Sequence, residues 1–491
     1  MINHKHPLDH ARLVHILQNR SQVLNLIGRN ERSLADLERA LVVSRACRDK
    51  RSQADCLLQL CQIYSSLSRY PDMLSSAQGS FSLYQELQDQ KGQAESLNNF
   101  GYVHNRLGDY SRAREHYDRS LKIQHEIGDK RGQSYSLSNI GTACNCQGDF
   151  SRALEYFARS LEIQQDTGDQ PGQAISLSNI GGVYGQLGDY PRALEHYDRS
   201  LRIRDRIGDR QGQANILSNI GVIRSFLSDW SGTLEYNLRS LKIREETGDR
   251  RGQALCLSNI GAVQGQLGNY PRALEYHVRA FKIQTEISDR KNQAVSLGNI
   301  GAVHDALGDH SQALEYYGRS LAMREEMGDR LGQASSLNNI ANLYLGQGRA
   351  AEARDCLVRA EGIVRESGGK NILRKIWLSL GELELSSAAG EASRAKAMEY
   401  ASRSLRLAGE LKSRAGRTEA LLLQARMERD GGKFLEAIAA FKELNQPLET
   451  AKAYFYYGRT MARQEAVEQA RAIFDGLGAR GWLARIAASD G

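Results

Sequence analysis

The stretch Gln173-Ala174-Ile175-Ser176-Leu177-Ser178-Asn179-Ile180-Gly181 decides the fold, because close copies of it return every 40 residues. The copies span residues 93–101, 133–141, 213–221, 253–261 and 293–301. The spacing holds without insertion from residue 52 to 371. A fixed period of this length is typical of repeat architectures, in which each unit packs on its neighbours. Residues 52–371 are therefore predicted to form eight regular units.

Each unit has the pattern of two helices joined by tight turns. In the unit that we use as the example, apolar residues recur at helical spacing over 174–187 and again over 193–203. Gly188 is suited to end the first helix, and the Asp189 side chain to cap the second. Pro191 falls in the first turn of the second helix, where its missing N–H is harmless. The chain is thus predicted to be an array of helical hairpins.

Glycine also occurs in the middle of the first helix of six units, where it costs about 1 kcal/mol relative to alanine. These glycines are Gly101, Gly141, Gly181, Gly221, Gly261 and Gly301. A cost that recurs in every unit needs a compensating gain, and close approach of the second helix supplies one. The second helices carry matching small residues, namely Ala113, Ala153, Ala193, Ala273 and Ala313.

The two ends depart from the regular pattern. Residues 1–51 are predicted to be a degenerate N-terminal repeat or cap, and residues 372–491 to be degenerate C-terminal repeats with a capping helix. The C-terminal part contains an insertion around 388–393, two shorter units near 416–447 and 448–478, and a last helix near 480–488. It is also rich in aromatic residues, which fit either the core of terminal repeats or an exposed docking face.

The composition excludes several classes of protein. The chain of 491 residues has 41% hydrophobic and 25% charged residues, too many apolar ones for a disordered tail. It has no run of 18 apolar residues, and residues 1–6 lack the apolar core of a signal peptide. Seven cysteines are an odd number and too few for a disulfide framework, so we expect a cytoplasmic protein with reduced thiols.

The repeat pattern resembles the tetratricopeptide repeat. The resemblance rests on Leu177, Ile180-Gly181, Tyr184, Ala193, Tyr197 and Ser200, and on their equivalents in the other units. The 40-residue form is similar to that of the LGN/Pins adaptors and of repeat arrays in bacterial multidomain signalling proteins. The resemblance implies an all-α, right-handed superhelical solenoid in which the first helices line a concave groove. The unit at 212–251 departs most, with Ser228-Asp229-Trp230, Thr233 and Asn237 at positions that are otherwise regular.

One position of the expected groove is almost constant. It holds Asn99, Asn139, Asn179, Asn219, Asn259, Asn299 and Asn339. A carboxamide offers both donors and an acceptor, so a row of them can pair with the backbone of an extended peptide without reading its side chains. The alternative is that these residues tie neighbouring helices together or reflect recent duplication.

Other groove residues break this uniformity. Tyr102, Arg106 and Arg224 belong to the candidate peptide-binding set, and the two arginines are the clearest positive charges near the groove. Because no larger Lys/Arg cluster accompanies them, we expect an extended internal segment or a folded partner rather than a C-terminal peptide. The same residues could equally be solvent-exposed variation.

No catalytic or cofactor motif is present. The sequence contains no Walker loop, G-x-S-x-G, H-E-x-x-H or dinucleotide fingerprint. His4, His6, His10 and Cys47 have no metal-ligand spacing, and Cys144 and Cys146 point to different sides of one helix. We therefore expect no catalytic residues, no metal and no cofactor. The net charge of +7 comes from interleaved charges, which gives little support to nucleic-acid binding.

Together these observations predict a non-catalytic protein–protein interaction scaffold or sensor that binds an extended partner segment in its groove. The alternative is a regulatory array that controls an effector enzyme in the same polypeptide or complex. Self-association through the nearly identical repeats is a third possibility. Neither a membrane nor a nucleic acid is expected as a partner.

Overall fold

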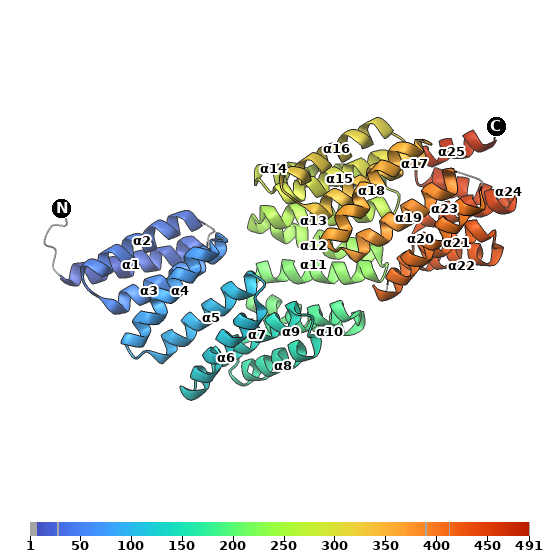
Figure 1. The fold of residues 1–491 in the computed structure, drawn as a ribbon. Coiled ribbons are helices and arrows are strands. Elements are labelled where there is room, and N and C mark those ends of the chain that lie inside the picture. Colours follow the sequence, from blue (N-terminus) through green and yellow to red (C-terminus); the bar gives the residue numbers. More distant parts are fainter. Residues whose placement is uncertain (1–6, 27–28, 388–389, 412, 491) are drawn as a thin grey trace. The chain divides into compact units, whose positions relative to one another are not determined.

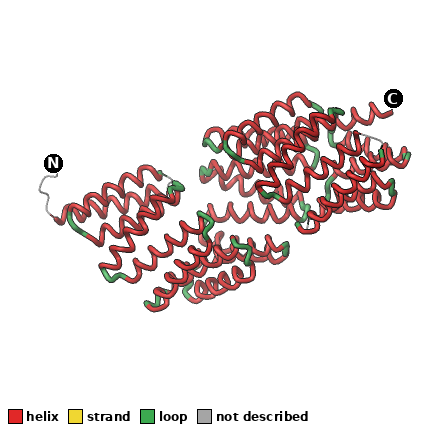
Figure 2. Tube along the Cα trace, viewed as in Figure 1, coloured by secondary structure: helices red, strands yellow, loops and turns green. Residues whose placement is uncertain are grey.

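The computed structural model describes residues 7–26, 29–387, 390–411 and 413–490, and all regular elements within these ranges are α-helices. Figure 2 shows the helices in red, joined by short green loops. Consecutive helices pair as hairpins, so the predicted all-α hairpin architecture is confirmed. The chain divides into two compact units, Met1–Asp209 and Arg210–Gly491, which are described separately.

Unit 1 consists of five hairpins (Figure 1). Its helices are α1 (Pro7–Leu26), α2 (Asn30–Ala46), α3 (Lys50–Ser66), α4 (Tyr70–Glu86), α5 (Gln90–Arg106), α6 (Tyr110–Glu126), α7 (Lys130–Cys146), α8 (Phe150–Asp166), α9 (Gln170–Leu187) and α10 (Tyr190–Ile207). Each hairpin packs on the next one along the chain, as expected for a repeat array.

Unit 2 begins with four further regular hairpins and continues into the degenerate repeats. Its helices are α11 (Arg210–Phe226), α12 (Trp230–Thr247), α13 (Arg250–Gln266), α14 (Tyr270–Glu286), α15 (Arg290–Leu307), α16 (His310–Glu326), α17 (Arg330–Gly346), α18 (Ala350–Ser367), α19 (Lys370–Ser387), α20 (Glu391–Glu410), α21 (Arg414–Glu428), α22 (Gly431–Glu443), α23 (Pro447–Met461), α24 (Gln464–Gly476) and α25 (Arg480–Asp490). The insertion predicted around 388–393 includes residues 388–389, which lie outside the described residues.

The turns between helices have the chemistry that the Gly-Asp pairs predict. Gly188 ends α9 at φ +78°, a left-handed conformation that favours glycine. The Asp189 side chain accepts a hydrogen bond from the backbone N–H of Arg192 and so caps α10. Pro191 lies in the first turn of α10, as predicted.

The mid-helix glycines allow close contact within each hairpin, also as predicted. A Cβ atom on Gly101 would lie 2.4 Å from the Tyr117 ring, and one on Gly301 would lie 2.8 Å from the Tyr317 ring. These distances are too short for any side chain to fit without displacing the aromatic ring. The aromatic ring of the second helix therefore occupies the space that the glycine leaves free.

Two recurring polar contacts connect the helices. Ser200 donates a 2.7 Å hydrogen bond to the Ala174 carbonyl across its hairpin, and Ser120 and Ser240 do the same in theirs. In most copies the glutamine that opens the repeated stretch reaches back to the preceding hairpin. Gln133 Nε2, for example, donates to the Gln124 carbonyl at 3.1 Å. Sequence reasoning gave no role to this glutamine.

The unit at 212–251 keeps both its helices despite its departures from the pattern. Asn237, which replaces the aromatic residue, donates to the Thr233 carbonyl at 2.8 Å and fills the space over Gly221. Trp230, which stands where other units have tyrosine or phenylalanine, donates through Nε1 to the Asn445 carbonyl at 2.7 Å. The departures in this unit thus include a contact with a residue that lies 215 positions further along the chain.

Candidate binding groove

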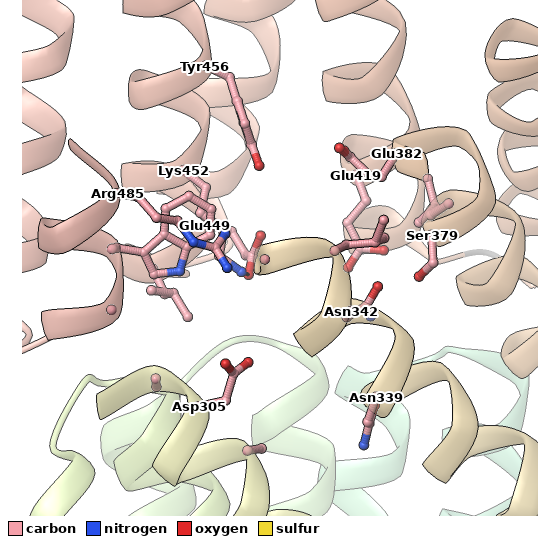
Figure 3. A pocket seen from close by; sticks show the side chains of 18 of the residues that line it. Asp305, Asn339, Asn342, Ser379, Glu382, Glu419, Glu449, Lys452, Tyr456 and Arg485 are labelled. Carbon is pink, nitrogen blue, oxygen red and sulfur yellow. Dashed lines mark hydrogen bonds and ion pairs between the residues drawn. The ribbon is translucent and has the colours of Figure 1, made fainter. Parts of the chain in front are cut away.

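Unit 2 contains a cavity of about 530 Å³. The first helices of successive hairpins line it, namely α15, α17, α19, α21 and α23, together with the terminal helix α25. In Figure 3 the side chains of these helices point from several directions into one space. The cavity therefore lies on the face where the sequence predicts the groove.

The C-terminal helices pack back against the regular repeats and so form one wall of the cavity. Helix α25 packs on α15, and a Cβ atom on Gly481 would lie 3.3 Å from the Asp305 carbonyl oxygen. Phe474 and Ile486 share a buried cluster with Val303. The Trp230–Asn445 hydrogen bond adds a second connection of the same kind. Residues far apart in sequence thus form opposite walls of the cavity.

Small residues make room for this return. At the last turn of the first helix, the two hairpins that α25 meets carry Ala306 and Gly346. The equivalent residues of the five units before them are larger: Arg106, Cys146, Gln186, Phe226 and Gln266. A Cβ atom on Gly346 would lie 1.9 Å from a terminal nitrogen of Arg485. The sequence signal for the contact was therefore this loss of side-chain volume.

Most charged groups around the cavity are paired. Arg426 holds Glu382 at 2.5 Å and lies over the Tyr456 ring, 3.7 Å from its centroid. Lys452 contacts Glu449 at 2.7 Å. Burial would lower the pKa of Lys452, but the attraction of Glu449 outweighs it, so this pKa is raised and the ammonium stays charged.

Other polar groups keep free hydrogen-bonding capacity. Asn339 and Asn342 on α17 and Ser379 on α19 face the cavity in Figure 3. Within the described part of the chain their side chains make no hydrogen bond. Carboxamide and hydroxyl groups of this kind can pair with the N–H and C=O groups of a bound backbone.

The predicted asparagine row occupies equivalent places on the first helices. All seven of its side chains are half-buried. Asn339 lines the cavity of unit 2, and Asn99 lines a cavity of about 480 Å³ in unit 1. Asn259 instead donates to Asn237 at 3.2 Å, which is the structural role weighed as the alternative. The row therefore contains both groove-lining residues and one that connects helices.

The other candidate residues are not among those that line the cavity of unit 2. Arg106 in unit 1 donates to the Tyr70 hydroxyl at 3.1 Å and lowers the pKa of that phenol. Tyr102 is half-buried on the same helix. Arg224 binds Asp229 at 2.5 Å, beside the turn between α11 and α12. Both arginines are thus held by residues of the chain itself.

The described residues offer neither a metal site nor a membrane-spanning helix. They contain no cluster of His, Cys, Asp or Glu able to hold a metal ion, and His4 and His6 lie outside them. Cys144 is buried and Cys146 exposed, so they do point to different sides of α7. No described helix is both long and apolar enough to cross a bilayer.

Comparison with known families agrees with this architecture. The tetratricopeptide repeat model matches residues 92–166, 172–246, 212–286 and 252–326, and a second tetratricopeptide repeat model matches 333–360. Together these matches cover just over half of the chain. The chain belongs to the tetratricopeptide repeat family. No curated protein sequence matches this tetratricopeptide repeat protein.

Solved structures share the fold of this tetratricopeptide repeat protein at low sequence identity. One is a signal transduction ATPase with numerous domains (STAND) from Pyrococcus horikoshii that has a tetratricopeptide repeat sensor, with 13% identity and a TM-score of 0.55. The match covers 69% of this chain but only 53% of the STAND protein. Another is the apo form of RapI, with 15% identity, coverage of 76% and 99%, and a TM-score of 0.53.

Sequence reasoning missed most of the charged residues of the cavity. Lys452, Arg426 and Arg485 come from the degenerate C-terminal repeats, where no regular register identifies a groove position. The available signals were weak: the small residues Ala306 and Gly346, and the unusual Trp230. Each of these became interpretable only once its tertiary contact was known.

Proposed function

We propose that this tetratricopeptide repeat protein is a non-catalytic scaffold or sensor, and that an extended segment of its protein partner binds in the cavity of unit 2. The observation that carries the proposal is the cavity wall formed by α17 and α19. There Asn339, Asn342 and Ser379 present unused hydrogen-bonding groups to a space of about 530 Å³.

An extended backbone suits this wall better than a compact apolar ligand. Each peptide unit of an extended chain exposes one N–H and one C=O, which a carboxamide can satisfy together. Asn339 and Asn342 are three positions apart on α17, so they lie on one face of the helix. Ion pairs such as Arg426–Glu382 make the cavity wall polar while adding little net charge to it. These features support the binding of a peptide through its main chain.

A second candidate function is the control of an effector enzyme by the array. It is favoured by the fold similarity to the STAND protein, in which a tetratricopeptide repeat sensor accompanies further domains. This chain corresponds to about half of that protein. In this case the same cavity receives the signal, and an effector in the same polypeptide or complex responds to it.

Selection from a random peptide display library tests the proposal. The library is panned on the purified full chain, the enriched peptides are synthesised, and their affinities are measured by calorimetry. We expect the double variant N339A/N342A to lose about tenfold in affinity or more, since it removes two groups that pair with the bound backbone.

The matched control is N179A, which changes the equivalent residue on α9 of unit 1. Circular dichroism checks that each variant keeps its helices. Equal affinity for wild type and N339A/N342A, or no enriched peptide at all, contradicts the proposal. An equal loss with N179A assigns binding to the asparagine row in general rather than to the cavity.

A further inference from the structure

The terminal helix α25 differs from the other walls of the cavity. It has only 11 residues and contacts α24 on one side and α15 on the other. Trp482 anchors it: this ring stacks on Phe474 at 5.2 Å between centroids and meets Phe455 and Tyr456 edge-on at 6.0 and 6.2 Å. A short helix with few partners belongs to the least stable part of a fold, so its docking is easily biased by a ligand.

Arg485 on this helix has no carboxylate partner among the side chains that the structure describes. The residue is half-buried, and its guanidinium lies 4.5 Å from the centroid of the Trp482 ring and extends to Gly346 on α17. No described acidic side chain lies within ion-pair distance of it. The other cavity cations, Arg426 and Lys452, each hold a glutamate. Arg485 is thus the cation of this cavity that can take a carboxylate from a ligand.

Physical chemistry favours such a ligand. A partly buried guanidinium without a counterion loses hydration that its contact with a ring only partly replaces. A carboxylate can accept two parallel hydrogen bonds from one guanidinium, which makes the pair strong and directional. Occupation of Arg485 by a ligand carboxylate would therefore relieve a cost that the unliganded cavity carries.

The acidic residues of the cavity restrict the kind of anion. Asp305 lies 3.2 Å from the His310 Nδ1 atom and pairs with no arginine or lysine among the described residues. The same space is lined by Glu382, Glu419 and Glu449, which pair with Arg426, Arg374 and Lys452. A small anion with several charges, such as phosphate, would need several free cations, whereas Arg485 is the one arginine or lysine of the cavity lining that holds no described carboxylate. A peptide with a single carboxylate fits these charges better, because the carboxylate can pair with Arg485 while backbone N–H groups face Asp305.

We propose that Arg485 binds the side-chain carboxylate of an aspartate or glutamate in the partner segment, and that this ion pair fixes α25 against α17. The inference rests on the proposed function, because it assigns a residue preference to the segment that occupies the cavity. Binding then closes the cavity, since the ligand joins its least stable wall to the regular repeats. The protein is in this way selective for an acidic residue and responds to it with an ordered α25.

Parallel display selections on wild type and R485Q test the preference. We expect the peptides enriched on wild type to share an acidic residue at one fixed position, and those enriched on R485Q to lack it. Exchanging this residue for its amide, Glu to Gln or Asp to Asn, should weaken binding to wild type about tenfold and leave binding to R485Q unchanged. Enriched peptides without a shared acidic residue overturn the inference but leave the proposed function standing. Selections that enrich no peptide overturn both.

Hydrogen–deuterium exchange tests the closure. The selected acidic peptide should slow exchange of the α25 amides at least tenfold, and its amide variant should not. G346Q introduces the glutamine that Gln186 and Gln266 provide at this position, so α17 stays helical while the space for Arg485 is filled. We expect this variant to lose the protection of α25 by the peptide. Equal protection by both peptides, or unchanged protection in G346Q, contradicts the closure.

Discussion

The hairpins of unit 1 and the C-terminal half of unit 2 use the same building block in two ways. Within unit 1, α5 to α10 pack mainly against their own partners and the adjacent hairpins. In unit 2, the degenerate repeats return to α15, so that Gly481 meets Gly308 and Trp230 meets Asn445. A strict repeat therefore keeps its main contacts between neighbouring hairpins, whereas departures from it produce the long-range contacts that bring the C-terminal helices back to α15.

The largest effect should come from removing an aromatic side chain from each region. Phe474 and Phe157 are 0% and 2% exposed, so truncation to alanine should cost about 3–5 kcal/mol in each case. F157A should destabilise α7 and α8, because it removes the ring that fills the space over Gly141. F474A should in addition release α25, since Trp482 stacks on this ring.

Hydrogen exchange mapped along the chain distinguishes the local effect of F157A from the effect of F474A, which extends to α25. A single unfolding midpoint cannot make this distinction in a repeat array. Faster exchange in α25 and at the α15–α16 turn is expected in F474A but not in F157A. The contrary outcome is that F474A accelerates exchange only in α23 and α24. That result would show that the packing of α25 on α15 contributes little to the stability of the C-terminal half.

A pH-dependent effect is expected at His277, which stands where Tyr197 and Tyr317 occupy other units. It is 3% exposed, and burial lowers its pKa from 6.5 to about 4. The unfolded chain therefore takes up this proton at a higher pH than the folded one. The contribution of His277 to the free energy of unfolding is therefore fully present above pH 6.5. It falls by about 3 kcal/mol as the pH decreases toward 4.

H277Y should remove this dependence, because a tyrosine stays neutral throughout the interval and fits the space over the mid-helix glycine in other units. The measurement is the difference in unfolding free energy between H277Y and wild type at several pH values. This difference should grow as the pH falls from 6.5 to 4. A constant difference would show that His277 does not carry the pH dependence.

A smaller difference between the two regions is expected when a turn glycine is replaced by alanine. Gly188 and Gly308 both have positive φ, so alanine should cost each about 1 kcal/mol in backbone strain. A Cβ atom on Gly188 meets nothing within 4 Å, whereas one on Gly308 would lie 3.2 Å from the Gly481 nitrogen. G308A should therefore also accelerate hydrogen exchange in α25, with G188A as the control. Identical behaviour of the two variants would argue against tight docking of α25.

The smallest effect concerns the ion pairs at the open ends of the hairpins. Arg250 contacts Glu286 in unit 2, but Gln90 stands opposite Glu126 at the equivalent place in unit 1. Both Arg250 and Glu286 are exposed, so R250Q should cost less than 1 kcal/mol. Q90R should add a few tenths of a kcal/mol by completing the missing pair. Urea denaturation at low and high salt checks both, because the changes should shrink with added salt.

The regular part of the fold could be predicted because each contact there depends on nearby residues. The mid-helix glycines predicted close helix contact, and the structure places the Tyr117, Tyr197 and Tyr317 rings over three of them. The Gly-Asp turns followed from the conformational freedom of glycine and the capping ability of aspartate. The candidate site was predicted only in part. Asn339 lines the cavity, whereas Arg224 is held at a turn.

The sequence by itself determined the all-helical class, the hairpin units and the close contact within each hairpin, because a 40-residue period imposes the same local contacts in each unit. Only the tertiary structure decided that the last helices return to α15 and bring Arg485, Lys452 and Tyr456 into one cavity. The physical reason is the range of the interactions. Helix caps and hairpin packing depend on residues within one or two units, whereas the return depends on how small differences in packing add up along many units.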